Sequence, residues 1–152
     1  MNSANYDIIT VGGGLAGAAL GKAMAEQGKR VLILERETEF KDRVRGEFLS
    51  PWGVAEAAQL GIYEIIRDSC GVDAPITNLG FGPRDLPETT PQRLPALGFS
   101  HPEMQETVLN EAQKSGAEVR RGVTVLNVAP GVQPAVTVQD SQGTNPLLPH
   151  SS

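Results

Sequence analysis

Three glycines at fixed spacing are the residues of this sequence with the clearest chemical potential. The run GGGLAG, residues 12–17, has the spacing G-x-G-x-x-G and directly follows a short apolar stretch. In this pattern Gly12 permits a tight turn, Gly14 lets the backbone approach a pyrophosphate, and Gly17 lets a helix lie against a strand. The free amides at the start of that helix are suited to binding phosphate.

Glu35 is the second chemically informative residue. It follows an aliphatic run, residues 31–34, that is typical of a strand buried on both faces. The alanine-rich segment 15–27 before it predicts a helix that ends at Gly28. A carboxylate about 20 residues past such glycines can accept both hydroxyls of an adenosine ribose. Alternatively, the glycines could serve only close packing in a βαβ unit that binds no dinucleotide. The complete order of elements favours a dinucleotide site.

Three arginines follow these elements. Arg36 adjoins the ribose carboxylate, where it could reach an adenine or a phosphate or could equally be a solvated surface residue. Arg43 and Arg45 lie in a polar loop that could fold over an anionic cofactor, since guanidinium pairs well with phosphate.

Composition excludes several classes of function. The 152 residues suit one ordinary domain, and 39% hydrophobic with 20% charged residues is typical of a soluble globular protein. The net charge of −5 offers no basic face to nucleic acid. No apolar run reaches the ~20 residues of a membrane span, and no leader pattern opens the chain. We therefore expect a cytoplasmic protein without nucleic-acid or membrane partners.

Metal binding is not expected. Cys70 is the single cysteine, so a cysteine-based metal site would lack partners, and His101 and His150 are isolated. Cys70 reads more readily as a small buried apolar residue than as a reactive thiol.

The rest of the chain predicts further helices and strands around this unit. Ser50-Pro51 is typical of a helix start, and a second short helix is expected at 62–68. Prolines and glycines dominate 71–98, where we expect a ribbon of two short strands, 76–81 and 94–99, joined by a mobile loop at 84–92. A further helix is expected at 101–115, and the strands that follow it are expected at 117–120, 123–128 and 135–139.

These elements predict an α/β fold. We expect a Rossmann-like βαβ domain of the glutathione-reductase-like kind, made of residues 1–70 and 100–140. Residues 71–99 would begin a substrate-domain β-ribbon, and residues 141–152, which lack periodicity, would form a disordered tail.

The sequence resembles the N-terminal part of the class A FAD-dependent monooxygenases, the aromatic hydroxylase group that is related to flavin halogenases and geranylgeranyl reductases. Three segments carry the resemblance: VGGGLAG with LILERE, then RGEFLSPWGVAEAAQLGI, then HPEMQETVLNEAQKSGAEVRRGVTVLNV. The first is shared by many flavoproteins, whereas the second and third together are more specific.

The resemblance implies FAD as the cofactor and assigns residues to it. Main-chain groups of Gly12, Gly14, Leu15 and Ala16 would meet the pyrophosphate, and Glu35 the ribose. Arg36 would lie near the adenosine and Arg45 near the diphosphate and ribityl chain. His101 stands where the family has Arg or Gln, and Val125 would touch adenine through its backbone.

The sequence also departs from the family pattern. It contains neither the Asp-Gly nor the Gly-Asp element that the family carries further along, which suggests a truncated chain too short for turnover. In the intact family NAD(P)H reduces FAD and a hydroxyl group is transferred to an organic, often aromatic, substrate. No catalytic residue is assigned.

Two alternatives remain open at this point. The chain could be a non-catalytic FAD- or ADP-binding fragment, or it could serve a halogenase or geranylgeranyl-reductase type of oxidoreductase. A nicotinamide dehydrogenase domain is disfavoured, because the second and third segments fit the flavin family.

Overall fold

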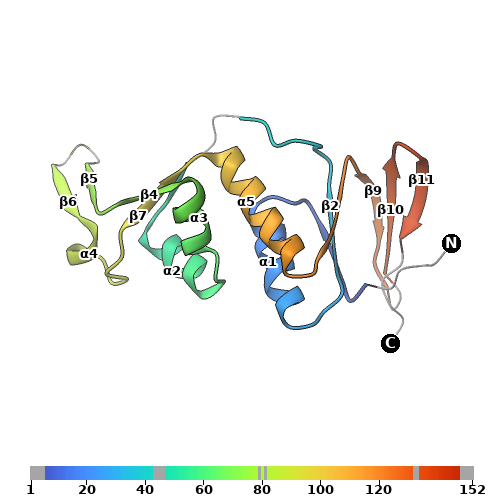
Figure 1. The fold of residues 1–152 in the computed structure, drawn as a ribbon, viewed down its shortest axis with the longest axis horizontal. Coiled ribbons are helices and arrows are strands. Elements are labelled where there is room, and N and C mark those ends of the chain that lie inside the picture. The colour runs from blue at the N-terminus through green and yellow to red at the C-terminus, as the bar shows by residue number, and fades with distance from the viewer. Residues whose placement is uncertain (1–5, 43–46, 79, 81, 132–133, 148–152) are drawn as a thin grey trace. The chain divides into compact units, whose positions relative to one another are not determined.

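The computed structural model describes residues 6–42, 47–78, 80, 82–131 and 134–147 (Figure 1). The chain divides into two compact units, Met1–Phe40 with Leu109–Ser152 and Lys41–Val108. The boundaries differ from the expected division at 70/71 and 99/100, because the helices at 51–59 and 63–70 pack on a strand of the second unit.

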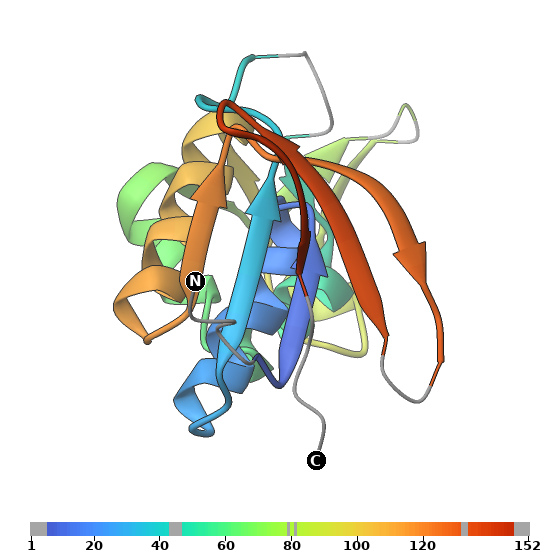
Figure 2. The same cartoon turned by 90° about the vertical axis from the view of Figure 1, so that its right-hand side faces the viewer.

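The first unit is built on a parallel sheet with the strand order β1-β2-β8. Its elements are β1 (Ile8–Val11), α1 (Leu15–Glu26), β2 (Val31–Glu35), the last turns of α5 (His101–Lys114) and β8 (Glu118–Arg121). All five residues of β2 are buried. Figure 2 shows β2 between β8 and β1, with α1 behind the sheet and an antiparallel ribbon in front. The central strand is thus covered on both faces, which explains its continuous aliphatic sequence.

The alternation of side chains along β2 assigns each to one face. A Cβ added to Gly21 of α1 would lie 2.5 Å from Ile33 Cδ1, so the helix lies directly on that side chain. Leu32 and Leu34 point the other way, into a core shared with Tyr6, Val136 and Val138. The alanine-rich helix predicted from the sequence therefore serves close packing on β2.

The antiparallel ribbon has the order β11-β10-β9. Its strands are β9 (Thr124–Ala129), β10 (Ala135–Asp140) and β11 (Gly143–Leu147). The expectation of a disordered tail after residue 140 is wrong for 143–147, which pair with β10 from Asp140↔Gly143 to Val136↔Leu147. Residues 148–152 lie outside the described part of the chain.

A polar cluster lies beside this core. The Tyr6 hydroxyl donates to Glu118 Oε2, and Arg120 donates from Nη2 to the Tyr6 oxygen at 3.0 Å and from Nε to Glu118 Oε1 at 2.7 Å. Burial, followed by the bond to Glu118, raises the pKa of Tyr6. Burial pushes the Glu118 pKa upward, but the bonds from Tyr6 and Arg120 outweigh it and lower that pKa. The cluster therefore ties the residues before β1 to β8.

The second unit contains a sheet of order β3-β7-β4 and a separate hairpin, β5-β6. Its elements are β3 (Phe48–Leu49), α2 (Pro51–Gln59), α3 (Tyr63–Cys70), β4 (Gly71–Ala74), β5 (Ile76–Asn78), β6 (Pro83–Asp85), α4 (Leu86–Thr89), β7 (Ala96–Phe99) and the first turns of α5. The core includes Val54, Ile66 and Leu97, each fully buried.

The proline-rich stretch is more ordered than the sequence suggests. Its two expected strands do not pair with each other: β5 pairs with β6, and β7 pairs with β3 and β4. The predicted mobile loop 84–92 is also wrong, because it contains part of β6 and the whole of α4. The Asp85 side chain caps this short helix by accepting from the Glu88 amide at 2.9 Å.

The two units together form a mixed α/β structure with a Rossmann-like βαβ element, as the sequence predicts. Among the helices that the structure describes, none has both the length and the apolar character needed to cross a bilayer.

Candidate cofactor-binding site

The turn between β1 and α1 is fixed by its glycines. Gly12 has φ +104°, a conformation that favours glycine, and its amide donates to Leu34 O at 2.7 Å. A Cβ on Gly17 would lie 2.0 Å from Gly12 O, so only glycine fits there without movement of the backbone. The close approach expected for Gly17 is thus present in the structure.

Helix α1 presents uncapped amides at its start. Gly14 occupies the N-cap in an extended conformation and has no side chain to cap the helix, while Leu15 and Ala16 form the first turn. The first turn contains no acidic residue. The leading amides of a helix have no partner within it, and the dipole adds positive charge there. This end of α1 is therefore suited to an anion.

Glu35, at the end of β2, is anchored to the glycine turn. Its Oε2 accepts the Gly13 amide at 2.7 Å, and its Oε1 accepts the Glu37 amide at 2.7 Å. The residue is only 8% exposed. A carboxylate has about four acceptor positions, so two remain for a ligand. The anchoring orients the carboxylate before any ligand binds.

Sequence reasoning missed the part played by Gly13. A Cβ at this position would lie 3.1 Å from Glu35 Cβ and 3.2 Å from Leu109 Cδ2. The motif itself leaves this position open, so the glycine spacing did not reveal it. The available signal was the parallel pairing of β1 with β2, which brings the ends of the two strands together.

A cavity of about 310 Å³ opens beside these groups. It is lined by Val11, Gly12, Leu34, Glu35, Arg36, Val123, Thr124 and Val125. Four predicted site residues, Gly12, Glu35, Arg36 and Val125, thus meet in one cavity. Val11, Leu34, Val123 and Thr124 were not predicted.

Backbone contacts hold the far wall of this cavity in place. The Val123 amide donates to Glu35 O at 3.0 Å, which joins the start of β9 to the end of β2. The register of β9 against β10 shifts so that Val125 pairs with Val138 and Asn127 with Thr137. Leu126 is thereby left as a bulge, directly after the residue predicted to contact adenine.

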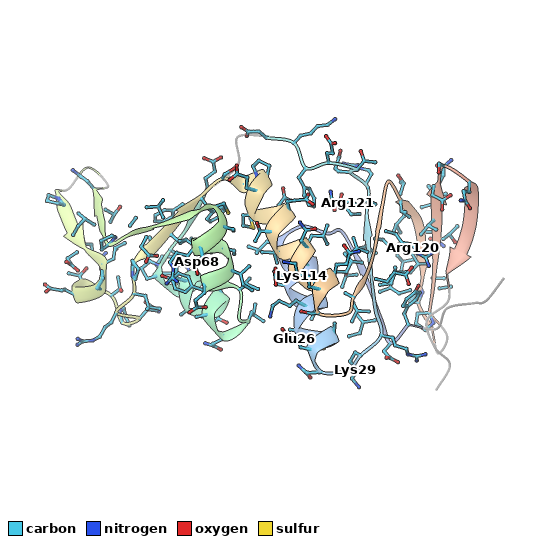
Figure 3. All side chains as sticks on the ribbon, in the orientation of Figure 1. Glu26, Lys29, Asp68, Lys114, Arg120 and Arg121 are labelled. Carbon is cyan, nitrogen blue, oxygen red and sulfur yellow. The ribbon has the colours of Figure 1, made fainter. Side chains whose placement is uncertain are left out.

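The loop after Glu35 is held by Arg121. This side chain donates from Nη1 to Thr38 O at 3.0 Å and lies over the Phe40 ring, 4.7 Å from its centre. Arg120 and Arg121 are consecutive residues of β8, and Figure 3 shows them on different sides of the strand. One joins the polar cluster around Tyr6, and the other fixes the segment next to the cavity.

The remaining predicted residues differ in how the structure places them. The Arg36 side chain is 67% exposed and pairs with Glu37 at 3.3 Å while lining the cavity. Arg45 lies outside the described residues. His101 begins α5 in the second unit, and its Nδ1 is buried with no hydrogen-bond partner among the described residues.

Strand, glycine turn, helix, strand and terminal acid together define a dinucleotide-binding α/β protein. A family model described as the FAD binding domain matches residues 5–147. The chain belongs to this FAD-binding-domain family, and its cofactor is FAD. The two free acceptor positions of Glu35, the uncapped helix and the adjacent cavity fit the ADP half of that molecule.

Curated relatives include squalene epoxidase erg1 of Schizosaccharomyces pombe, 38% identical over 78 residues, which are 51% of this chain and 16% of that protein. Squalene epoxidase 3 of Arabidopsis thaliana is 41% identical over 64 residues, 42% of this chain and 12% of the relative. The matched stretches thus span under a fifth of the length of these relatives.

Solved structures share the fold. OxyS anhydrotetracycline hydroxylase from Streptomyces rimosus has a TM-score of 0.80 at 25% identity, over 95% of this chain and 30% of its own. The p-nitrophenol 4-monooxygenase PnpA from Pseudomonas putida has a TM-score of 0.81 at 19% identity, over 95% of this chain and 39% of its own. A ternary complex of aklavinone-11 hydroxylase with FAD and aklavinone has a TM-score of 0.72 at 21% identity, over 98% of this chain and 32% of its own.

Proposed function

We propose that the first unit binds the ADP half of FAD for a flavin-dependent monooxygenase. The observation that carries the proposal is the Glu35 carboxylate, which lines a cavity and is held by the Gly13 and Glu37 amides. It binds the ribose hydroxyls, the amides at the start of α1 bind the pyrophosphate, and the Val125 backbone meets the adenine.

The role of this unit is to bind and orient the cofactor. Bound FAD supplies the redox chemistry, taking electrons from NAD(P)H and reacting with oxygen. Main-chain amides and one fixed carboxylate position its adenosine end. Arg36, which lines the cavity, adds positive charge near the adenosine.

The substrate is proposed to be an organic molecule that accepts one oxygen atom. The names of the relatives support this class, since they include squalene epoxidases, a p-nitrophenol 4-monooxygenase and an anhydrotetracycline hydroxylase. Aromatic hydroxylation is the reaction that the resemblance of the sequence favours, and epoxidation is favoured by the more identical curated relatives.

The family resemblance also assigns Arg45 and His101 to the cofactor. We restrict the proposed site to the first unit, since Arg45 lies outside the described residues and His101 belongs to the second.

Calorimetric titration with ADP and with FAD tests the proposal. Replacing Glu35 by Ala removes the ribose acceptor, and hydrogen bonds to charged groups contribute about 1.5 to 3 kcal/mol. We expect ADP and FAD to bind roughly ten- to a hundredfold more weakly. Glu35→Gln, which keeps one acceptor oxygen, is expected to fall between Ala and the wild type.

Glu56→Ala serves as the control, because Glu56 is exposed on α2 in the other unit. Circular dichroism of each variant checks that the fold is kept. Wild-type affinity for ADP in a folded Glu35→Ala protein would show that the ribose is held elsewhere.

A further inference from the structure

Arg121 lies directly opposite Glu35 in the parallel sheet. The register of β8 against β2 pairs Arg121 with Glu35 and Arg120 with Leu34. Partners in such a register point to the same face of a sheet, and neighbours along one strand point to opposite faces. The Arg121 side chain therefore leaves β8 on the face that carries the Glu35 carboxylate, and Arg120 leaves it on the other face (Figure 3).

The contacts of Arg121 lie in the segment that follows Glu35. Its Nη1 donates to Thr38 O at 3.0 Å, and its guanidinium carbon lies 4.7 Å from the centre of the Phe40 ring. A guanidinium over an aromatic ring is attracted to the negative face of the ring. Gly122 continues the contact, because a Cβ built on it would lie 3.4 Å from Thr38 Cγ2. The end of β8 thus holds this segment at several points.

The same segment carries one of the two amides that fix the Glu35 carboxylate. The Glu37 amide donates to Glu35 Oε1 at 2.7 Å, and the next residue is Thr38, whose carbonyl Arg121 binds. Only the soft torsions of two residues separate that amide from that carbonyl, since the peptide bond between them is planar. Thr38 and Glu39 are exposed, so burial contributes little to holding the segment in place.

We infer that Arg121 is a positioning residue for the adenosine site. It fixes Thr38, and through Thr38 it fixes the Glu37 amide, so that the Glu35 carboxylate keeps the orientation in which it accepts from a ligand. The Gly13 amide holds the other oxygen of this carboxylate from the side of the glycine turn. To name the ribose as the ligand rests on the proposed function, whereas the effect on the Glu37 amide is measurable without any ligand.

Amide hydrogen exchange of the full chain without ligand tests the first step. Arg121→Met removes both the donor and the charge, and we expect the Glu37 amide to exchange about tenfold faster, as for loss of one hydrogen bond that opposes local opening. Arg121→Lys, which keeps a donor for Thr38 O, should fall between Met and the wild type. An unchanged rate at Glu37 in Arg121→Met would overturn the inference.

Arg120→Met is the matched control, because Arg120 is the neighbouring arginine of the same strand and bonds to Tyr6 and Glu118 instead. It should lower the thermal stability without changing the exchange of the Glu37 amide or the affinity for ADP. Equal effects of Arg120→Met and Arg121→Met on these two quantities would mean that general destabilisation explains them, and the inference would fall.

Calorimetric titration with ADP tests the second step in a double-mutant cycle. Arg121→Met alone should weaken ADP roughly two- to tenfold, the range for one hydrogen bond. In the Glu35→Ala background it should cause no further loss, because its effect passes through that carboxylate. Additive losses would show that Arg121 contacts the ligand directly or acts through stability, and either result would contradict the positioning role.

The two experiments separate this inference from the proposed function. A wild type that binds no ADP but shows the faster Glu37 exchange in Arg121→Met would refute the proposed function and leave the hold on the Glu37 amide intact. A wild type that binds ADP, is weakened by Glu35→Ala and is unaffected by Arg121→Met would refute this inference alone.

Discussion

The structure has a cavity in each of its two units, and the two cavities differ in the parts of the chain that shape them. The cavity in the first unit is bordered by the glycine turn and by a carboxylate that main-chain amides hold in place. The cavity in the second unit, of about 380 Å³, is formed by side chains from β3, α2 and the β5-β6 hairpin, with one arginine, Arg84, fixed by Thr89. Backbone geometry tolerates changes of side chain except at its glycines, whereas a cavity made of side chains can change its ligand with one substitution.

The largest combined effect on stability and on ADP binding should come from Gly17→Ala. The new Cβ would lie 2.0 Å from Gly12 O, a backbone atom, so either the turn or the helix must move. Overpacking of this kind costs about 1 to 3 kcal/mol, and here it also displaces the amides at the start of α1. We expect ADP binding to fall at least about tenfold in calorimetric titration.

Gly98→Ala is the matched control for this change. A Cβ on Gly98 would meet its nearest neighbours at 3.8 Å, an ordinary contact, and its φ is not positive. It should leave ADP binding unchanged. If Gly17→Ala also bound ADP normally, backbone approach at the turn would not determine the affinity, and the contrast between the two cavities would fail.

The first site was largely predictable because chain order determines it. A strand, three spaced glycines, a helix and a strand ending in Glu35 give similar geometry wherever β1 and β2 pair in parallel. The cavity in the second unit was not predicted, since its lining comes from residues 48 to 92 and depends on pairings that no local pattern records.

Two errors of prediction have specific physical causes. Segment 143–147 was expected to be part of a tail because it lacks periodicity, yet β11 is an edge strand that pairs with β10, and at a sheet edge the missing amide of Pro146 is tolerated. Segment 84–92 was expected to be a loop because of its prolines. Pro87 lies in the first turn of α4, where proline is favoured, and Asp85 with Glu88 supplied an unrecognised cap signal.

A pair of tyrosines extends the comparison to stability. Tyr6 in the first unit bonds to Glu118 and Arg120, and it is 5% exposed. Tyr63 in the second unit bonds to Asp73 at 2.7 Å in an exposed setting. We expect Tyr6→Phe to lower the free energy of unfolding by about 1 to 2 kcal/mol, and Tyr63→Phe by under about 0.5 kcal/mol. Urea denaturation measures both.

The effect of Tyr6→Phe on the free energy of unfolding should depend on pH. The Glu118 pKa is below its usual value in the folded protein, so its contribution is present at neutral pH and is lost as the pH falls through the folded-state pKa. The difference between wild type and Tyr6→Phe should therefore shrink in acid. A difference that stayed constant from neutral pH down to about pH 3 would show that the Glu118 bond contributes nothing.

The smallest effect on stability is expected at the amino ends of β1 and β2, away from the glycine turn. Asp7 accepts from Arg30 through Nη2 at 2.9 Å and through the backbone amide at 2.8 Å. The side-chain bond from Arg30 contributes most and the backbone bond next, and they lower the pKa of Asp7 from 3.8 to about 2. The pair is exposed, so salt screens it and its contribution to stability is small.

A carbon-13 titration of the Asp7 carboxyl group should therefore show a midpoint near 2 at low salt. Because the folded-state pKa is lowered, the pair stabilises the fold above the usual pKa of 3.8 and loses its effect as the pH falls toward 2. Arg30→Gln should raise the midpoint only part of the way back, since the residue 30 amide still donates, and should leave ADP affinity unchanged. A loss of ADP binding in Arg30→Gln would show that the two ends of the strands are coupled, and that the site depends on more than the glycine turn and Glu35.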